Sequence, residues 1–441
     1  MKYLIQFSHS YFQFRIPELN SLLELNGLQP SDCYKIEDYH EESPFLIVSL
    51  PSDDVAKKIA SRAVLIKTIQ EYWMNAPSFE NLLERIASVS QEFLPKCSTN
   101  QTSWKLDVDS FGKSISSTDQ KKYIQSVLDK INLPGPIQMK HPDLLLVLSF
   151  DCGHIGEEIK QVYFGRFVAS GQRTINRDYD LKRRKYIGPT STCAELSFLM
   201  SNQVLSRPGA VMWDCFAGTG SLLVASTAHG SHCIGTDIDV RVLKGIKKGK
   251  KAESVRSNFS QYGLRFPELV RADLSALPLR FRGLIDGILC DPPYGIRAGA
   301  RKTCSRVGEH PPTEIREGHI PRTEVYDPDD VIVDLLNVAA KTLVLGGRLA
   351  YLLPTFGEHG EKEVPEHPCL ELVSNSEEKL QTHVSRRLVT MKKTAEYEEN
   401  KEEEYKEFCR KSIKRNNISY ANLKEFVYSK KKEEWYVCLN E

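Results

Sequence analysis

Two glycines that follow an apolar segment mark the first place where this chain could hold a small ligand. Residues 211–216 have the pattern of a buried strand, and the turn after them contains Gly218 and Gly220. Glycines at such a turn let the backbone approach a ligand at the carboxyl end of the strand. A dinucleotide fingerprint would carry a third glycine where Leu223 stands, and Asp214 lies on the strand side of the turn. NAD binding is therefore disfavoured.

Two further apolar segments end in a carboxylate. Residues 233–237 end at Asp237, whose oxygens are suited to accept hydrogen bonds from ribose hydroxyls. Residues 271–273 end at Asp273, which could accept a hydrogen bond from an adenine amino group, although an isolated aspartate here is more often a helix cap. The pattern indicates a nucleoside-containing ligand at the ends of neighbouring strands.

The third chemical signal is an acid followed by two prolines and an aromatic residue, namely Asp291, Pro292, Pro293 and Tyr294. Prolines have no N–H, so the backbone presents carbonyl acceptors in a rigid extended shape. With the Asp291 carboxylate they would form an acceptor-rich pocket for an exocyclic amine, while Tyr294 could stack on a planar ring. The alternative interpretation is an ordinary proline turn at the end of a strand. The glycine turn earlier in the chain favours the interpretation as a pocket for an amine.

Secondary-structure elements must position these residues, and the sequence shows two different patterns of apolar and polar residues along the chain. From position 188 onward, apolar segments alternate with helical ones, which favours a mostly parallel, doubly wound sheet. Before about position 175 the pattern is α+β. We expect C-terminal strands at 211–216, 233–238, 269–272, 284–290 and 348–353, N-terminal strands at 3–7, 45–50, 104–108, 137–140 and 144–150, and N-terminal helices at 17–25, 53–62, 79–89 and 119–131.

Composition excludes several classes of protein. The 441 residues include 59 basic and 58 acidic side chains, so the net charge of +1 gives no global attraction to nucleic acid or membrane. The eleven cysteines contain no C-x-x-C pair, which argues against a common zinc site. No apolar stretch has the length of a membrane span, and polar residues interrupt the apolar run at residues 1–8, so we expect neither a membrane span nor a secretion signal. We expect free thiols in a reducing cytosolic or nuclear compartment.

Taken together, the motifs resemble a known family. The D-x-F-x-G-x-G at 214–220 with D-P-P-Y at 291–294 is similar to class I S-adenosylmethionine-dependent amino-methyltransferases. The runs YIGPTSTCAEL at 186–196, DPPYGIRAGARK at 291–302 and LLNVAAKTLVLGGRLAYLLP at 335–354 resemble the catalytic-subunit family of eukaryotic tRNA (guanine-10-N2)-methyltransferases. WKLDVDSFGK at 104–113 and IQMKHPDLLLVL at 137–148 resemble that family's ferredoxin-like and THUMP module. Cys215 and Cys193 depart from the family, which often has proline and an acid there.

The resemblance implies a Rossmann-like class I methyltransferase domain behind an N-terminal α+β ferredoxin-like/THUMP module. By position, Asp237 would hold the ribose of S-adenosyl-L-methionine and Asp273 its adenine, while residues 190–192 would place the methionine end beside the glycine turn. Asp291, Pro292, Pro293 and Tyr294 would hold the target base. The full cofactor set is Thr190, Ser191, Thr192, Asp214, Phe216, Gly218, Gly220, Asp237 and Asp273.

Polar and basic residues separate the two parts of the chain. We expect a ferredoxin-like and THUMP module at 1–172, a basic linker at 173–188, a methyltransferase domain at 189–393 and a charged helical tail at 394–441. Basic side chains in the linker and just after D-P-P-Y are candidates for phosphate contacts, against the alternative of a solvated linker. They are Arg177, Lys182, Arg183, Arg184, Lys185, Arg297, Arg301 and Lys302.

The predicted activity is methylation of the exocyclic N2 amine of guanosine 10 in tRNA, without a metal. Two alternatives are adenine-N6 methylation of nucleic acid, since D-P-P-Y serves both amines, and a non-catalytic tRNA-binding scaffold. The THUMP-like part disfavours a DNA enzyme, and retention of the acidic and glycine motif residues disfavours a scaffold. The resemblance also implies a small zinc-containing activator subunit, a heterodimer and a cytoplasmic location.

Overall fold

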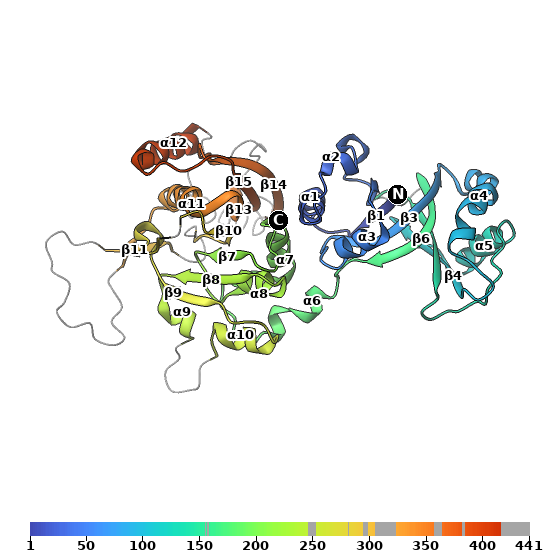
Figure 1. The fold of residues 1–441 in the computed structure, drawn as a ribbon, viewed down its shortest axis with the longest axis horizontal. Helices are drawn as coiled ribbons and strands as arrows, with labels where there is room; N and C mark the ends of the chain where they lie inside the picture. Colours follow the sequence, from blue (N-terminus) through green and yellow to red (C-terminus); the bar gives the residue numbers. More distant parts are fainter. Residues whose placement is uncertain are drawn as a thin grey trace, which may run out of the picture. The chain divides into compact units, whose positions relative to one another are not determined.

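The computed structural model describes residues 1–154, 156, 158–245, 253–280, 282–293, 299–304, 323–356, 364–381 and 384–415. The chain forms two compact units, Met1–Thr174 and Ile175–Glu441, and Figure 1 shows the elements of each. Among the described residues, no helix combines the length and apolar character needed to cross a membrane.

The N-terminal unit is built on a six-stranded sheet in the order β2-β1-β3-β6-β5-β4. Only the β4–β5 pair is parallel, and the other neighbours run antiparallel. Its strands are β1 (Lys2–Phe7), β2 (Phe45–Ser49), β3 (Ile66–Ala76), β4 (Trp104–Phe111), β5 (Leu144–Asp151) and β6 (Gln161–Ser170). Its helices are η1 (Phe12–Phe14), α1 (Arg15–Leu25), α2 (Pro30–Cys33), η2 (Ile36–Asp38), α3 (Asp53–Ala60), α4 (Phe79–Phe93), η3 (Leu94–Lys96) and α5 (Ser117–Leu128).

The sheet of this unit is rolled, because side chains from strands that are not neighbours meet across one face. Asp109 of β4 accepts hydrogen bonds from Gln6 Nε2 of β1 at 2.8 Å and from Lys67 Nζ of β3 at 2.7 Å. The alternating side chains of β1, such as Tyr3 and Ile5, point the other way and pack against α1 and α3. A second core lies under α4 and α5.

The pattern at 137–140 predicted a strand, and this prediction is wrong. Ile137 makes only an isolated bridge to Trp104, and Met139 is 68 % exposed. A sheet position would bury apolar side chains on at least one face, whereas Ile137 is itself 65 % exposed. The long strand β3 was not predicted, because polar residues interrupt its apolar ones.

The C-terminal unit contains a seven-stranded sheet in the order β14-β15-β13-β10-β7-β8-β9. The five strands from β13 to β9 are parallel, and β15 runs antiparallel between β13 and β14. They are β7 (Val211–Asp214), β8 (His232–Asp237), β9 (Glu268–Arg271), β10 (Ile285–Cys290), β13 (Leu343–Phe356), β14 (Leu370–Gln381) and β15 (Val384–Lys393), and a separate pair is formed by β11 (Arg301–Thr303) and β12 (Thr323–Val325).

Helices cover both faces of this sheet, as a doubly wound fold requires. On one face, α7 is joined to the sheet through Gln203, which accepts from Thr390 Oγ1 at 2.5 Å and from Arg348 Nη1 at 3.1 Å. On the other face, α11 and α12 share a core with the sheet. The helices are α6 (Ile175–Asp178), η4 (Leu181–Arg183), α7 (Ala194–Gln203), α8 (Ser221–Ala228), α9 (Val240–Lys244), α10 (Val255–Gln261), η5 (Leu274–Ala276), α11 (Pro328–Thr342), η6 (Glu399–Lys401) and α12 (Glu402–Arg415).

The segment predicted as a basic linker is bound to the C-terminal unit over its second half. Gln261 of α10 accepts from the Lys185 amide at 2.9 Å and donates to the Arg183 carbonyl at 2.9 Å. Asn258 of α10 exchanges two hydrogen bonds with the backbone of Tyr186. We call residues 179–188 the strap.

The charged tail begins as a docked helix. Tyr405, Cys409 and Ile413 of α12 lie in the core shared with the sheet, and Lys406 pairs with Asp334 of α11 at 3.6 Å. Its predicted helical character therefore applies to 402–415, and residues 416–441 lie outside the described part of the chain.

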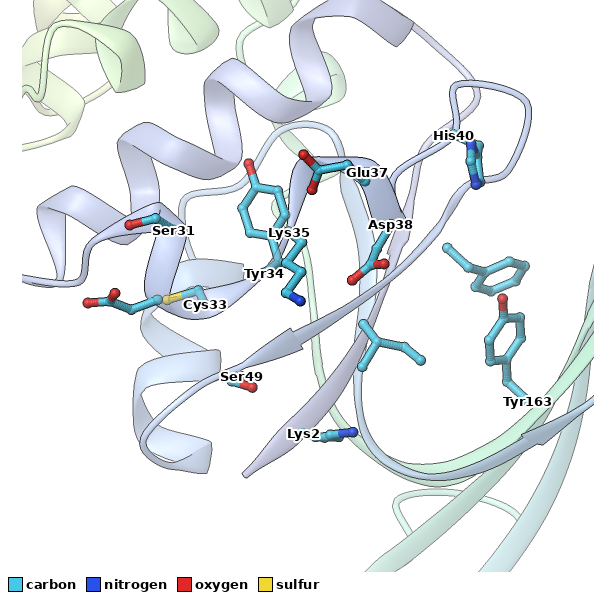
Figure 2. A pocket seen from close by; sticks show the side chains of 13 residues that line it. Lys2, Ser31, Cys33, Tyr34, Lys35, Glu37, Asp38, His40, Ser49 and Tyr163 are labelled. Carbon is cyan, nitrogen blue, oxygen red and sulfur yellow. The ribbon is translucent and has the colours of Figure 1, made fainter.

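A surface hollow of about 660 Å³ lies in the N-terminal unit between α2, η2 and strand β2 (Figure 2). Carboxylates of Asp32, Glu37 and Asp38 line it together with the amines of Lys2 and Lys35. Because side chains of both signs line it, the hollow favours neither an anion nor a cation. None of the residues that the sequence motifs single out contributes to it.

Candidate active site

The glycine turn between β7 and α8 is shaped by two left-handed residues. Gly218 has a φ of +51° and Gly220 a φ of +80°, a region that other L residues rarely adopt. A Cβ on Gly220 would also lie 2.8 Å from Val255 Cγ1 of α10. The turn therefore requires glycine for its conformation and, at position 220, for its close packing.

Asp237, at the end of β8, is tied to this turn. Its Oδ2 accepts from the Gly218 amide at 2.9 Å and its Oδ1 accepts from the Asp239 amide at 2.8 Å. Burial raises the pKa of Asp237, and the two amide donors oppose that effect. Each carboxylate oxygen has a second lone pair, so the group can still accept hydrogen bonds from a diol.

Three carboxylates gather at the carboxyl ends of adjacent parallel strands. Asp214 ends β7, Asp237 ends β8 and Asp291 follows β10, and the sheet places β7 between the other two. Asp214 is 1 % exposed and its Oδ1 accepts from the Phe216 amide at 3.0 Å. Burial raises the pKa of Asp214 well above 3.8, and the charges of Asp237 and Asp291 act in the same direction. The three carboxyl groups therefore disfavour one another's ionisation, and a bound cation would favour their charged forms.

The segment 190–192 lies beside the glycine turn. Ser191 Oγ shares a hydrogen bond of 2.7 Å with Thr219 Oγ1, and it also accepts from the Gly188 amide at 2.9 Å. Thr192 is buried, whereas Thr190 is exposed. The hydroxyl-rich segment is thus held between the strap and the turn.

Asp273 has the capping role that the sequence left open. It is the N-cap of η5, and its Oδ1 accepts from the Ser275 amide at 2.9 Å. Its Oδ2 accepts from the Thr303 amide at 2.5 Å, which anchors β11. Burial raises the pKa of Asp273, but these hydrogen bonds outweigh it and the pKa is lowered. The carboxylate is ionised and lies one strand beyond Asp237.

Asp291 and the two prolines extend from the end of β10, which runs between β7 and β13. Pro292 is buried, and Asp291 and Pro293 are half-buried. Predicted site residue Tyr294 lies outside the described residues. The arrangement leaves the Asp291 carboxylate at the same edge of the sheet as the glycine turn.

Sequence reasoning missed Arg386 of β15. Its guanidinium pairs with Glu378 of β14 and has electrostatic contact with Asp291 and Cys193. Burial opposes the charge of Arg386, yet the carboxylates around it raise its pKa. It lies in the run SRRLVTMKK at 385–393, and nothing in its spacing there relates it to Asp291.

The predicted RNA-contacting residues fall into different environments. Arg177, Lys182, Arg183 and Lys185 are exposed. Arg184 is only 5 % exposed, with Nη1 donating to Ser221 Oγ at 2.8 Å and Nη2 to the Tyr179 carbonyl at 3.3 Å. The interpretation of Arg184 as a surface phosphate contact is therefore corrected, because its guanidinium is used to fasten the strap to α8.

The basic residues after D-P-P-Y lie partly on β11. Arg301 donates twice to Thr323 of β12, at 2.6 and 2.8 Å, and Lys302 lies 3.7 Å from Glu324. Arg301 remains exposed, and Lys302 is half-buried. Arg297 lies outside the described residues.

The donor set fits S-adenosyl-L-methionine. A carboxylate at the end of β8 suits the ribose diol, hydroxyls of the 190–192 segment lie beside the glycine turn, and the surplus of carboxylates suits a cation. Within the described part of the chain, no group of three or more histidine, cysteine, aspartate or glutamate side chains could hold a metal ion.

Comparison with known proteins gives the same assignment for both units. Residues 1–173 match the family model described as the Tmrp11 THUMP N-terminal domain, and residues 182–308 match the RMKL-like methyltransferase domain. The chain is 36 % identical over 415 residues to the tRNA (guanine(10)-N(2))-methyltransferase TRMT11 of Bos taurus, covering 90 % of this chain and 89 % of that protein. The Homo sapiens protein of the same name is 36 % identical over 416 residues, with 90 % and 89 % covered.

Among solved structures, TrmN from Thermus thermophilus aligns with a TM-score of 0.44 and 17 % identity, covering 89 % of this chain and 100 % of that one. The curated relatives confirm the family that the sequence motifs resemble and the fold class predicted with it. The chain belongs to the tRNA (guanine(10)-N(2))-methyltransferase TRMT11 family.

Proposed function

We propose that the C-terminal unit transfers a methyl group from S-adenosyl-L-methionine to the exocyclic N2 amine of guanosine 10 in tRNA, the reaction named for its relatives. The observation that carries this proposal is the convergence of Asp214, Asp237 and Asp291 at the ends of three adjacent parallel strands. In open α/β sheets, ligands bind at this edge.

The chain's own residues would divide the work of binding. Asp237 would accept from the ribose hydroxyls, Asp273 from the adenine amine, and Ser191 with its neighbours would contact the methionine end. The cofactor supplies the methyl group on a cationic sulfur. Asp214 would hold the turn in place through the Phe216 amide rather than touch the ligand, since its oxygen is buried in that contact.

Asp291 would act on the amine. The lone pair of guanine N2 is delocalised into the ring, so the nitrogen is a weak nucleophile until it becomes pyramidal. A carboxylate and a proline-region carbonyl that accept its N–H bonds would favour the pyramidal form and stabilise the positive charge that develops on nitrogen. Arg386 would keep the Asp291 carboxylate ionised and oriented.

The tRNA would be held by the N-terminal unit together with basic residues of the strap region. Support comes from the exposure of Arg177, Lys182, Arg183 and Lys185, which cluster within nine residues of sequence. Lysine and arginine that neutralise phosphates release counterions, so this contribution depends on salt.

A small zinc-containing activator subunit is proposed as a partner in a heterodimer. Support comes from the family resemblance and from the sheet of the C-terminal unit, whose two edge strands are β9 and β14. An edge strand offers unpaired backbone N–H and C=O groups to a partner. A reducing compartment, the cytoplasm, is proposed from the ten described cysteines, all of which are free thiols.

The test compares nucleosides from tRNA of cells that lack this protein with tRNA from cells in which it is restored, by mass spectrometry. We expect N2-methylguanosine to disappear and return, and we expect the Asp291→Ala variant to restore far less of it than the wild type. Because Asp291 acts in the transition state, the variant should lose about 100-fold or more in rate while keeping its cofactor affinity. Methylation of adenine N6 instead, or unchanged tRNA, would refute the proposal.

A further inference from the structure

Four rings meet where three loops of the N-terminal unit come together. His9 follows β1, Phe111 ends β4, and His154 follows β5, while Phe12 begins η1. The His9 ring centroid lies 5.1 Å from both Phe111 and His154, and the Phe12 centroid lies 5.4 Å from both His9 and His154. We call these four residues the ring platform.

The platform is a surface feature rather than part of a core. His9 and His154 are exposed and Phe12 is half-buried, whereas Phe111 is 8 % exposed and forms the base. Partial desolvation lowers the pKa of His9, and its electrostatic interactions with His154 and Arg15 lower it further. The neutral imidazole is therefore favoured near pH 7, and the planes of the exposed His9 and His154 rings are tilted by 32° to one another.

The loop that carries His9 is held in an unusual backbone shape. Tyr11 has a φ of +49°, a left-handed conformation that costs a non-glycine residue free energy. Arg15, fully buried, donates from Nη2 to the Ser8 carbonyl at 2.6 Å, and its guanidinium lies 4.4 Å from the centroid of the Phe12 ring. The buried cation thus fixes both ends of the segment that supplies two of the four rings.

Lysines flank the platform. The side chain of Lys160 passes over Gly153, so close that a Cβ there would lie 2.9 Å from Nζ, and His154 is the next residue. Lys113 is exposed and packs beside Gly156. Lys160 lies 3.7 Å from Glu42 and is 59 % exposed, so its amine is also accessible to other anions.

From this arrangement we infer that the ring platform stacks an unpaired base of the substrate RNA, with Lys113 and Lys160 holding the adjoining phosphates. Aromatic faces flanked by cations are the usual construction of single-strand sites, because every base has a π face and every nucleotide a negative charge. Two imidazoles alone do not make a metal site, and the described residues add no third ligand. The inference rests on the proposed function, which supplies the RNA.

The test measures binding of the full chain with its activator subunit to a labelled single-stranded pentanucleotide and to a blunt hairpin, by fluorescence anisotropy. The variant His9→Ala with His154→Ala removes two rings. A matched control, His40→Ala with His232→Ala, removes two exposed histidines elsewhere, one of them beside the hollow of Figure 2. A second variant, His9→Phe with His154→Phe, keeps both rings and removes their nitrogens.

We expect the alanine variant to bind the pentanucleotide roughly 10- to 100-fold more weakly, the scale of one lost base stack, with the hairpin unaffected. The phenylalanine variant and the control should match the wild type. Lys113→Ala with Lys160→Ala should reduce the salt slope by roughly 0.7 for each lost phosphate. On tRNA, the alanine variant should raise KM and keep kcat.

Unchanged pentanucleotide affinity in the alanine variant would overturn the inference, and so would equal losses in the alanine and phenylalanine variants. Equal losses on pentanucleotide and hairpin would show phosphate binding without stacking, and would also overturn it. Failure of the wild type to methylate guanine N2 would instead refute the proposed function, because the oligonucleotide measurement does not depend on methyl transfer.

Discussion

Replacing Asp237 by alanine tests the proposed ribose contact of the cofactor site. The carboxylate would accept from two ribose hydroxyls, and each charge-assisted hydrogen bond is worth about 1.5 to 3 kcal/mol. The raised pKa of Asp237 reduces this gain, because part of the binding energy is used to keep the group ionised. We therefore take the lower value for each of the two hydrogen bonds. The expected loss of about 3 kcal/mol corresponds to a Kd for the cofactor roughly 150-fold higher in Asp237→Ala than in the wild type.

An amide at the same position should not rescue binding. Both oxygens of Asp237 accept backbone N–H groups, from Gly218 and from Asp239. In Asp237→Asn the NH2 group must face one of these donors, so a buried N–H loses its acceptor and the glycine turn is loosened. We expect the asparagine variant to bind the cofactor as weakly as the alanine variant. This result would show that the geometry of the carboxylate matters and not its charge alone.

The assay is isothermal titration of S-adenosyl-L-homocysteine into the full chain, with the proposed activator subunit present. Asp239→Ala is the matched control, since Asp239 caps α9 and pairs with Arg241 through its own side chain, and its Kd should stay within about threefold of wild type. A folded Asp237→Ala protein that titrates with the wild-type Kd would refute the assignment of the ribose site.

Three further predictions concern charge. Asp214→Asn should raise the free energy of unfolding near pH 7. Because the pKa of Asp214 is raised in the folded protein, the folded chain keeps a proton that the unfolded chain loses, and the free energy of unfolding of the wild type falls as the pH rises above 3.8. Urea titrations from pH 4 to 7 should show a smaller fall in the free energy of unfolding for the variant. Lys182→Glu with Arg183→Glu should weaken tRNA binding and reduce the dependence of the binding constant on salt concentration. Arg184→Ala should instead lower the free energy of unfolding by about 2 to 4 kcal/mol, because buried hydrogen bonds are lost. If both variants gave the same results in tRNA binding and in urea unfolding, the different environments of these residues would be contradicted. Arg386→Gln should lower kcat about tenfold and leave the affinity for S-adenosyl-L-homocysteine unchanged. As the pH is lowered, the variant should begin to lose activity at a higher pH than the wild type, because Asp291 loses a neighbouring cation. An unchanged dependence of kcat on pH would exclude a role of Arg386 in positioning Asp291.

The position of the site was predictable because parallel strands bring their carboxyl ends to one edge. A motif read at the end of residues 211–216 and another after 284–290 must therefore lie together once β7 and β10 are neighbours. The residues that complete the site come from further away in the chain. Arg386 reaches it through the antiparallel insertion of β15, and no local spacing encodes that register. The roles of the predicted site residues stay predictions.

Burial was the property that local sequence described least well. Arg184 lies in a run of basic residues whose composition is typical of solvated linkers. Its burial depends on the contact of its guanidinium with Ser221 of α8, which follows it in the chain. The 137–140 segment shows the converse, because its apolar residues predicted a strand that the structure leaves exposed. In both places the deciding contact is tertiary.

At the proposed cofactor site, the raised pKa values of Asp214 and Asp237 would also couple ligand exchange to the acidity of the medium. Carboxyl groups whose pKa is raised take up protons readily, and a bound cation favours their ionised forms. Entry of the cationic cofactor at the proposed site would therefore release protons into solvent. The thioether left after methyl transfer carries no such charge, and the protons return. The proposed pocket would therefore attract the cationic cofactor more strongly than the neutral thioether product, which would favour release of the product after methyl transfer.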